Sequence, residues 1–160
     1  MKQMTFAMIK PDGIKAKITG KIIDMIEQNG FDIVRMEKVH LDINDAQAFY
    51  DVHSKRPFFT ELTEFISSDP VIIMALEKDN AINAWRDLMG ATDSKKAAAG
   101  TVREKFGSKT NIMLNVTHGS DSVETAEEEL MFFFPDMFID EEWGIDEEDE
   151  DKDFNDEEEE

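Results

Sequence analysis

The sequence predicts an α/β fold, a ferredoxin-like α/β sandwich with a four-stranded antiparallel sheet (βαββαβ) plus extra short helices. Short apolar runs typical of strands alternate with segments whose apolar residues recur at helical spacing. Their order along the chain is strand, helix, strand, short helices, strand, helix, loop, strand and helix, which fits a split βαβ arrangement. A length of 160 residues, 41% of them hydrophobic, suits one compact domain followed by a tail.

The first quarter of the chain supplies two strands and a crossover helix. The run MTFAMI (4–9) predicts a buried strand, which Pro-Asp-Gly at 11–13 ends. Isoleucines at helical spacing predict a helix over 15–28, and Asn29-Gly30 ends it. The segment FDIVRMEKVHL (31–41) alternates with one irregularity and predicts the second strand.

Two short helices are expected before the third strand. Asn44 or Asp45 is the expected N-cap of the first, which continues toward Tyr50 and His53. The sequence RPFF opens the second, whose apolar side chains lie on one side: Leu62, Phe65 and Ile66.

The remaining elements repeat the pattern of strand and helix. The run VIIMALE is the clearest buried strand, and Asp79 is the expected cap of the helix after it. A loop over 90–100 and a short helix in TVREKFG precede NIMLNV (111–116), the expected last strand. Ser122 is the expected cap of a final helix with these residues facing inward: Val123, Ala126, Leu130, Phe133 and Phe134.

Charge is spread unevenly along the chain. The net charge is −20, and residues 139–160 contain fifteen Asp or Glu and one Lys. We therefore expect a mildly acidic domain over 1–138 and an acidic, disordered tail over 139–160. Either the tail is a solvated segment, which we favour, or it binds basic proteins or cations. Binding to nucleic acid is not expected, because the surface is acidic and no aromatic RNA-binding motif is present.

Cysteine usage and hydropathy indicate a compartment. The absence of Cys excludes disulfides and thiolate metal sites and favours a reducing environment. The N-terminal MKQMTFAMIKPDG has too few apolar residues for a signal peptide, and no segment approaches the length of a membrane span. We expect a cytoplasmic protein that does not contact membranes.

No glycine-rich phosphate loop is present. The nearest candidate, GIKAKITGKI, has six residues between its glycines and Ile after its lysine, which departs from the P-loop pattern. No G-x-G-x-x-G occurs either. A nucleotide site in this chain would therefore use side chains.

Among the three histidines, His118 is the best candidate for chemistry. His40 lies among apolar neighbours, where a structural role is favoured, and His53 shares a possible helical face with Tyr50, which is as readily a surface coincidence. His118 is expected at a strand exit, before a glycine and near a helix N-terminus, where anions are favoured.

The residues after His118 have two readings. Ser-Asp-Ser before an apolar-periodic helix is ordinary capping chemistry, which the local pattern alone favours over catalysis. Glu129, however, lies seven residues after Ser122 on the same helix face and could point back to the imidazole. A carboxylate on one ring nitrogen would fix the tautomer and leave the other nitrogen nucleophilic.

Five segments together resemble one known family. NVTHGSDSVETAEEEL is similar to the signature N-x-x-H-G-S-D-S-V-E-S-A of nucleoside diphosphate kinases. Four others resemble that family in the same order and at the same spacing: FAMIKPDG, FYDVHSKRPFF, WRDLMGAT and GTVREKFG. The matches cover about residues 3–134, and five ordered matches do not arise by chance.

This resemblance implies the fold, the reaction and roles for particular residues. The family has the ferredoxin-like sandwich and moves the terminal phosphate of a nucleoside triphosphate, typically ATP, to a nucleoside diphosphate through a phosphohistidine, by a ping-pong mechanism. His118 would be the nucleophile, oriented by Glu129 and Ser120. The residues implied to hold phosphates are Lys10 (also near the ribose), Tyr50, His53, Arg86, Thr92 and Arg103. Those implied to hold the nucleoside are Phe58 on the base, Leu62 beside it and Asn115 on the sugar.

The resemblance also implies a cofactor and an assembly. Mg²⁺ would bridge the nucleotide's phosphates without a direct protein ligand, with Asp121 at most an outer-sphere partner. The family forms homo-oligomers, tetramers or hexamers built from dimers, and the sequence does not choose between them. Ser94 stands where the family commonly has a loop proline, which puts oligomer stability but not catalysis in doubt. The acidic extension beyond Pro135 is unlike the short ending of bacterial members.

Overall fold

The computed structural model describes residues 1–138, so the predicted acidic tail over 139–160 lies outside the described residues. The elements are, in chain order, β1 (Lys2–Ile9), α1 (Pro11–Lys15), α2 (Thr19–Gln28), β2 (Asp32–Val39), α3 (Ile43–Phe49), the 3₁₀ helix η1 (Asp51–His53), α4 (Phe59–Ser67), β3 (Val71–Asp79), α5 (Ala81–Met89), η2 (Ser94–Lys96), α6 (Val102–Phe106), β4 (Thr117–Gly119), α7 (Val123–Phe133) and η3 (Pro135–Phe138).

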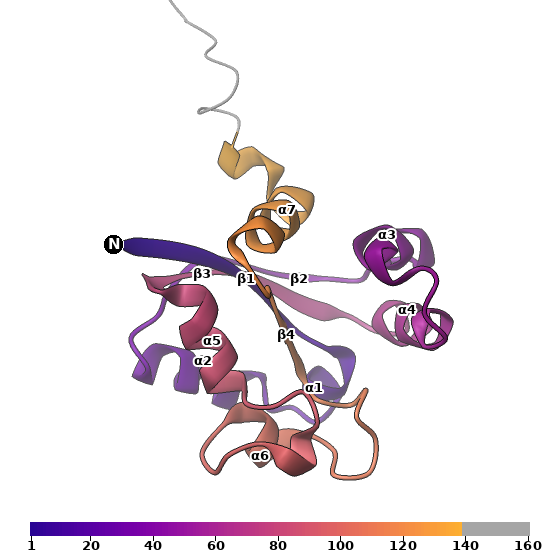
Figure 1. Cartoon of the computed structure of the whole chain (residues 1–160), viewed down its shortest axis with the longest axis horizontal. Helices are drawn as coiled ribbons and strands as arrows, with labels where there is room; N and C mark the ends of the chain where they lie inside the picture. Colours follow the sequence, from indigo (N-terminus) through magenta and orange to yellow (C-terminus); the bar gives the residue numbers. More distant parts are fainter. Residues whose placement is uncertain (139–160) are drawn as a thin grey trace, which may run out of the picture.

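The four strands form one antiparallel sheet, as the sequence predicts, and their order is β2-β3-β1-β4 (Figure 1). β1 and β3 pair along their whole lengths, from Lys2 opposite Asp79 to Ile9 opposite Ile72. The register of β2 shifts between Ile33 and Arg35, which confirms the irregularity expected in that strand. The sheet thus places β1 at its centre, next to the short strand β4.

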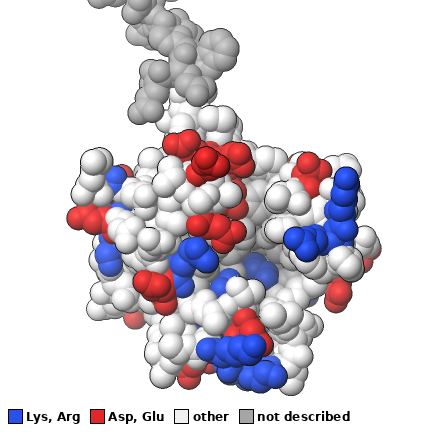
Figure 2. Space-filling view, viewed as in Figure 1, with Lys and Arg blue, Asp and Glu red and all other residues white. Residues whose placement is uncertain are grey.

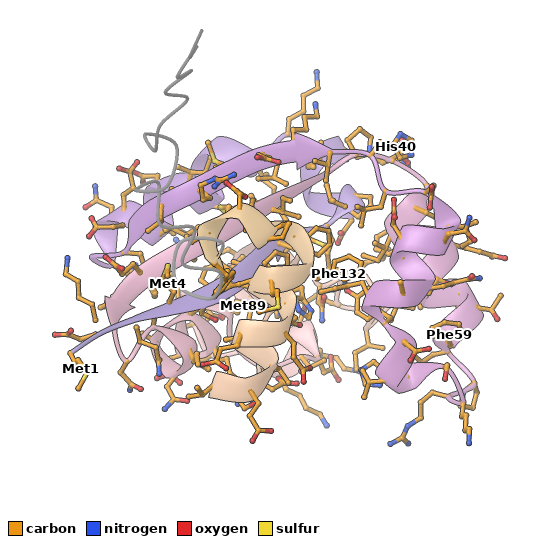
Figure 3. The ribbon with its side chains drawn as sticks, turned by 90° about the horizontal axis from the view of Figure 1, so that it is seen from above. Met1, Met4, His40, Phe59, Met89 and Phe132 are labelled. Carbon is orange, nitrogen blue, oxygen red and sulfur yellow. The ribbon has the colours of Figure 1, made fainter. Side chains whose placement is uncertain are left out.

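Apolar residues on alternate sides of the central strands form two cores. In β1, Ala7 and Ile9 face the core that contains α2 and α5, whereas Phe6 and Met8 face the core with α3, α4 and α7. All four side chains are fully buried. Helices therefore cover both faces of the sheet (Figure 1). Seen from above, α7 lies across the sheet with Phe132 on the side toward α3 and α4 (Figure 3).

The first predicted helix is two helices. Pro11 occupies the first position of α1, where its missing N–H and fixed φ suit a helix start rather than a break. The chain then leaves the helix at Lys17, whose φ of 58° lies in the left-handed region, before α2 begins at Thr19. The prediction of one helix over 15–28 is therefore wrong at its N-terminal end.

Two predicted caps are also wrong. The N-cap of α3 is Asp42, whose carboxylate accepts from Asp45 N–H at 2.8 Å; Asp45 is the third helical residue of the capping box. Asp79 ends β3, and Asn80 precedes α5 with a φ of 54°. The N–H of Ile82 donates instead to Gln3 Oε1 at 3.0 Å, so a β1 side chain satisfies the start of α5.

The last strand is later and shorter than predicted. Residues 111–116 are irregular: 112 and 113 form a turn, Asn111 Oδ1 accepts from Met113 N–H at 3.1 Å, and Val116 has a φ of 61°. The strand is β4, so His118 lies within the strand rather than at its exit. Side-chain hydrogen bonds to the backbone replace strand pairing in 111–116, which an apolar pattern does not reveal.

Ser122 caps α7 as predicted, with reciprocal bonds to Thr125. Four of the five residues expected to face inward are buried or partly buried, whereas Val123 is 55% exposed, because it occupies the first turn of the helix. Within residues 1–138, no helix is both long and apolar enough to cross a membrane.

Candidate active site

His118 is held at the middle of β4 by the sheet and by α5. It pairs with Met8 of β1, and its carbonyl accepts from the indole N–H of Trp85 at 3.2 Å. The next residue, Gly119, allows this close approach: a Cβ there would lie 2.5 Å from a Trp85 ring carbon and 2.6 Å from Met89 Cε. The backbone under the imidazole is therefore fixed by packing.

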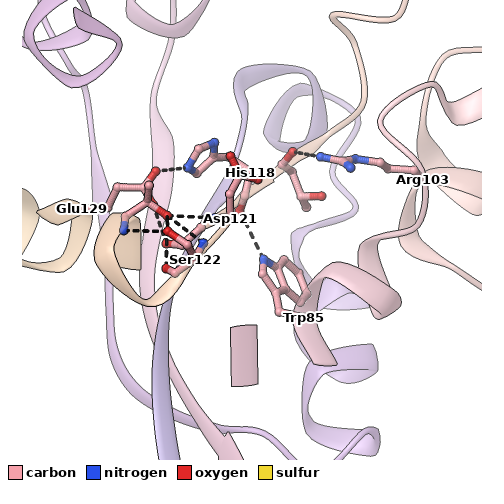
Figure 4. A network of polar contacts seen from close by, with 9 residues as sticks. Trp85, Arg103, His118, Asp121, Ser122 and Glu129 are labelled. Atoms are coloured by element: carbon pink, nitrogen blue, oxygen red, sulfur yellow. Dashed lines mark hydrogen bonds and ion pairs between the residues drawn. The ribbon is translucent and has the colours of Figure 1, made fainter. Parts of the chain in front are cut away.

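The imidazole is oriented by a carboxylate from α7. His118 Nε2 lies 2.7 Å from Glu129 Oε1, and the Ser120 hydroxyl donates to Glu129 Oε2 (Figure 4). Because a carboxylate accepts hydrogen bonds, Nε2 carries the proton and Nδ1 keeps its lone pair. Nδ1 has no hydrogen-bond partner within residues 1–138. The arrangement leaves Nδ1 as the nucleophilic nitrogen.

The helix cap and the carboxylate belong to one structure. Ser122 Oγ accepts from Thr125 N–H at 3.2 Å, and Thr125 Oγ1 accepts from Ser122 N–H at 2.9 Å. This capping box begins α7, and Glu129 follows on the helix face that reaches the imidazole. The two readings of this stretch are therefore compatible: Ser122 starts the helix that delivers the carboxylate.

Three aromatic rings surround the imidazole. The ring centres of Phe49, Phe6 and Tyr50 lie 5.3, 5.9 and 6.0 Å from that of His118. Burial, and then the nearby charge of Glu129, raise the pKa of Tyr50, so its hydroxyl stays protonated. Neither Phe6 nor Phe49 was predicted from the sequence to lie beside His118. The alternation of β1 would have placed Phe6 on the same face as Met8, the partner of His118.

Lys10 is buried at the end of β1 and holds the loop before β4. Its ammonium donates to Met113 O and Asn115 Oδ1, both at 2.7 Å, and the residue is 5% exposed. The Asn115 amide donates in turn to Thr92 O at 3.0 Å. Burial lowers the pKa of Lys10 to about 8, Asp12 opposes that shift, and the Arg103 charge adds to it.

Arg103 of α6 is a second buried cation. Its guanidinium donates to the carbonyls of Thr117 at 2.8 Å, Gly90 at 3.0 Å and Asn115 at 3.3 Å. Burial, and then the charge of Arg86, lower its pKa to about 10, so it remains charged at neutral pH. Arg103 therefore joins the loop after α5 to β4.

A polar cavity of about 730 Å³ opens beside Arg103. Four predicted site residues are among those that line it: Arg86, Thr92, Arg103 and Asp121. The space-filling view shows a hollow near the centre of the molecule, with basic side chains in and around it (Figure 2). Arg86 also donates to Asp121 O at 3.4 Å. The cavity is suited to a polyanion by charge.

The hollow in Figure 2 is a cleft between the region of β4 and the helices α3 and α4 (Figure 1). The helices η1 and α4 carry the remaining predicted residues. The His53 ring lies 6.4 Å from the Tyr50 ring and 5.6 Å from the Phe58 ring, so these three side chains form a row. Phe58 is 43% exposed, and Leu62 is half-buried against the core below it. His40 lies elsewhere, bonded through Nε2 to Ser67 O at 2.9 Å (Figure 3).

The donor set suits a metal ion that arrives with phosphates. No group of three or more His, Asp or Glu that could bind a metal occurs among residues 1–138. Asp87 and Asp121 are the carboxylate residues lining the cavity. One or two carboxylates together with substrate phosphates and water is the usual environment of Mg²⁺.

Comparisons with known proteins agree with this geometry. Residues 3–139 match the sequence family described as "Nucleoside diphosphate kinase". The nucleoside diphosphate kinase of Geotalea uraniireducens is 54% identical over 132 residues, which cover 82% of this chain and 95% of that protein. The Helicobacter pylori (strain P12) enzyme is 51% identical over 134 residues, covering 84% and 96%.

Solved structures of the same enzyme also superpose on this chain. The nucleoside diphosphate kinase of Aquifex aeolicus has a TM-score of 0.80 at 39% identity, covering 84% of this chain and 96% of that one. A halophilic enzyme from Halobacterium salinarum in complex with CDP has a TM-score of 0.79 at 37% identity, covering 84% and 88%. The predicted fold class is thereby confirmed.

Proposed function

The chain belongs to the nucleoside diphosphate kinase family, and from that premise we propose how its residues perform the family's ping-pong phosphate transfer. The terminal phosphate of a nucleoside triphosphate, typically ATP, passes to His118 and then to a nucleoside diphosphate. One observation carries the assignment of roles: the carboxylate of Glu129 occupies Nε2 of His118 and leaves the lone pair of Nδ1 available.

In the first half-reaction, Nδ1 attacks the terminal phosphorus. A P–N bond forms as the bond between that phosphorus and the bridging oxygen of the diphosphate breaks, and the diphosphate leaves with the bond's electron pair. The imidazole becomes cationic, and the Glu129 carboxylate on Nε2–H stabilises that charge. Ser120 holds the other carboxylate oxygen and so fixes the direction of Glu129.

Three cations neutralise the charge that the phosphates bring. We assign this role to Arg86 and Arg103, which line the cavity, and to the buried Lys10, with Thr92, Tyr50 and His53 completing the phosphate end. Phosphoryl transfer depends more on positioning and charge neutralisation than on covalent activation, so preorganised donors suffice. In the second half-reaction an oxygen of the acceptor's terminal phosphate attacks the phosphohistidine, and the P–N electrons return to Nδ1.

The exposed row at η1 and α4 suits a nucleoside. Phe58 stacks on the base, Leu62 packs beside it, and Asn115 hydrogen-bonds the sugar in this proposal. Stacking on an aromatic ring is open to every base, since each has a π-face. The relative that binds CDP, at 37% identity, supports a common nucleotide cleft.

The cofactor we propose is Mg²⁺, which when bound to the phosphates neutralises charge and aligns the leaving group. Asp121 lines the cavity, and its backbone carbonyl accepts from Arg86. We assign it a contact with the ion only through water. We further propose that the chain forms a homo-oligomer, either a tetramer or a hexamer, that is built from dimers. We also propose that it acts in the cytoplasm and that residues 139–160 are an acidic tail outside the kinase domain.

The test of the proposed function is nucleotide exchange by the purified full-length chain. With Mg²⁺, ATP and GDP, we expect GTP and ADP in equal amounts and parallel lines in double-reciprocal plots, the pattern of a ping-pong mechanism. His118→Ala should abolish exchange, because it removes Nδ1, the atom that accepts the phosphate in this mechanism. Exchange that persists in a folded His118→Ala variant, or intersecting lines in the wild type, would refute the proposal.

A further inference from the structure

The backbone between Asn115 and His118 adopts a conformation that its side chain disfavours. Val116 has a φ of 61°, and Thr117 N–H donates to Asn115 O at 2.8 Å. A hydrogen bond from residue i+2 to residue i, with a positive φ at the residue between, defines a γ-turn that is rare and strained. For a β-branched residue a positive φ is a genuine outlier, and such strain persists only where the surroundings impose it.

The surroundings of Val116 do impose it. Val116 O accepts from Lys10 N–H at 2.8 Å, and Val116 N–H donates to Asp12 Oδ2 at 3.0 Å. On either side of the turn, Arg103 donates to Asn115 O and to Thr117 O. The Val116 side chain is buried in the core that contains α2 and α5. Both backbone polar groups of Val116 are therefore bonded, as are the carbonyls of Asn115 and Thr117.

Lys10, Asp12 and Arg103 hold the turn, and of these three Asp12 alone has no role in the proposed reaction. It lies in the first turn of α1, and its second oxygen, Oδ1, is buried with no partner among the described residues. Burial raises its pKa, while Lys10 and the Val116 N–H oppose the shift. Burying a carboxyl group costs free energy unless it is hydrogen-bonded, and the Val116 N–H supplies such a bond to Asp12 Oδ2.

The turn determines where its neighbours point. Before it, the Asn115 side chain reaches Lys10 and Thr92; after it, β4 begins and presents His118 to Glu129. If the turn relaxed to an ordinary φ, these two groups would rotate relative to one another. We infer that Asp12 is a positioning residue, whose carboxylate holds the left-handed turn at Val116 and so sets the nucleotide-binding Asn115 and the nucleophile His118 in one register.

This inference rests on the proposed function, and a double-mutant cycle between Asp12 and Val116 tests it. Glycine adopts a positive φ without penalty, so Val116→Gly removes the need for an external clamp. The readout is the single-turnover rate of His118 phosphorylation by Mg-ATP in full-length protein, with the affinity for ADP measured alongside. Unfolding midpoints of each variant identify a temperature at which all are folded.

We expect Asp12→Ala to slow His118 phosphorylation about 10- to 100-fold, the size of effect that a small misplacement of reacting groups produces. Asp12→Asn should stay within about fivefold of wild type, since its amide oxygen still accepts from Val116 N–H. In the Val116→Gly background, Asp12→Ala should cost less than about threefold.

Three results would overturn the inference. Equal slowing by Asp12→Asn and Asp12→Ala would mean that the charge matters rather than the acceptor. An equal cost of Asp12→Ala in both backgrounds would mean that Asp12 does not act through the turn, and an unaffected Asp12→Ala would mean no role. If Asp12→Ala alone does not fold, the double variant decides: it should fold and match Val116→Gly. Wild type that takes no phosphate would instead refute the proposed function itself.

Discussion

The two walls of the cleft are built differently. On the wall formed by β1, β4 and α6, Lys10 and Arg103 are buried and bonded to backbone carbonyls before any ligand binds. On the wall formed by η1 and α4, Phe58 is 43% exposed, and its ring lies 5.6 Å from that of His53. The first wall, the rigid wall, is preorganised by these bonds, and the second, the open wall, is exposed. In the proposed mechanism the rigid wall holds the phosphates and the open wall holds the nucleoside.

The largest effect after loss of His118 itself is expected at Glu129 of α7, which orients His118 on the rigid wall. Glu129→Ala removes the partner of Nε2, so we expect transfer about 10²- to 10⁴-fold slower, the range for lost orientation and acid–base help. Steady-state kinetics measure it. The matched control is Glu128→Ala on the exposed side of α7, which should leave the rate unchanged. An unaffected Glu129→Ala would remove the proposed orienting role.

The rigid wall should also respond to pH through Lys10. Burial lowers its pKa to about 8, so below pH 8 the free enzyme carries the ammonium and above it the neutral amine. We expect kcat/KM to fall above about pH 8, by up to tenfold per pH unit, because phosphate attraction is lost. In Lys10→Arg this falling limb should move to higher pH. A flat profile to pH 9.5, measured in wild type, would contradict the assignment.

The open wall should give a smaller and unselective effect. Phe58→Ala is expected to raise KM about tenfold, within the range of one lost base-stacking contact, while kcat changes little. Measured with ATP, GTP, CTP and UTP, the loss should be similar for all four. Phe58→Tyr is the matched control and should retain affinity. A loss confined to one base would show that this wall reads base identity.

The smallest effect is expected outside both walls, at Ser94. Its hydroxyl is buried with no partner among the described residues, and Asp93 before it is extended, with φ −80° and ψ 107°, as a residue before proline prefers. We expect Ser94→Pro to stabilise the fold by about 0.4–1 kcal/mol by restricting the unfolded chain. Urea unfolding measures it, with Ser94→Ala as control. A proline variant less stable than the alanine variant would contradict this.

The sequence predicted more of the fold than of the loops. Periodicity identified β3 and α7, and helix geometry alone suggested that Glu129 turns back toward His118. It failed at 111–116, where an apolar run predicts a strand. There the N–H of Val116 is bonded to Asp12, 104 positions earlier, and local patterns contain no information about such a partner.

The roles within the site depended more on resemblance than on spacing. The local pattern favoured a plain helix cap at Ser122. Only the ordered matches to the kinase family elsewhere in the chain assigned His118 the role of nucleophile. The contacts of Phe6 and Phe49 with the His118 ring were not predicted. The sequence does not distinguish a core aromatic residue beside the site from one elsewhere in the core. Geometry added the choice of nitrogen, which no motif specifies.

That choice is the most direct test of the account. Wild-type protein incubated with Mg²⁺ and terminally labelled ATP, then denatured in base, should retain an acid-labile label that added GDP discharges before denaturation. NMR of the phosphorylated protein should place the phosphate on Nδ1 of His118, since Glu129 occupies Nε2. A phosphate on Nε2, or a label that persists in His118→Ala, would contradict the mechanism derived from this geometry.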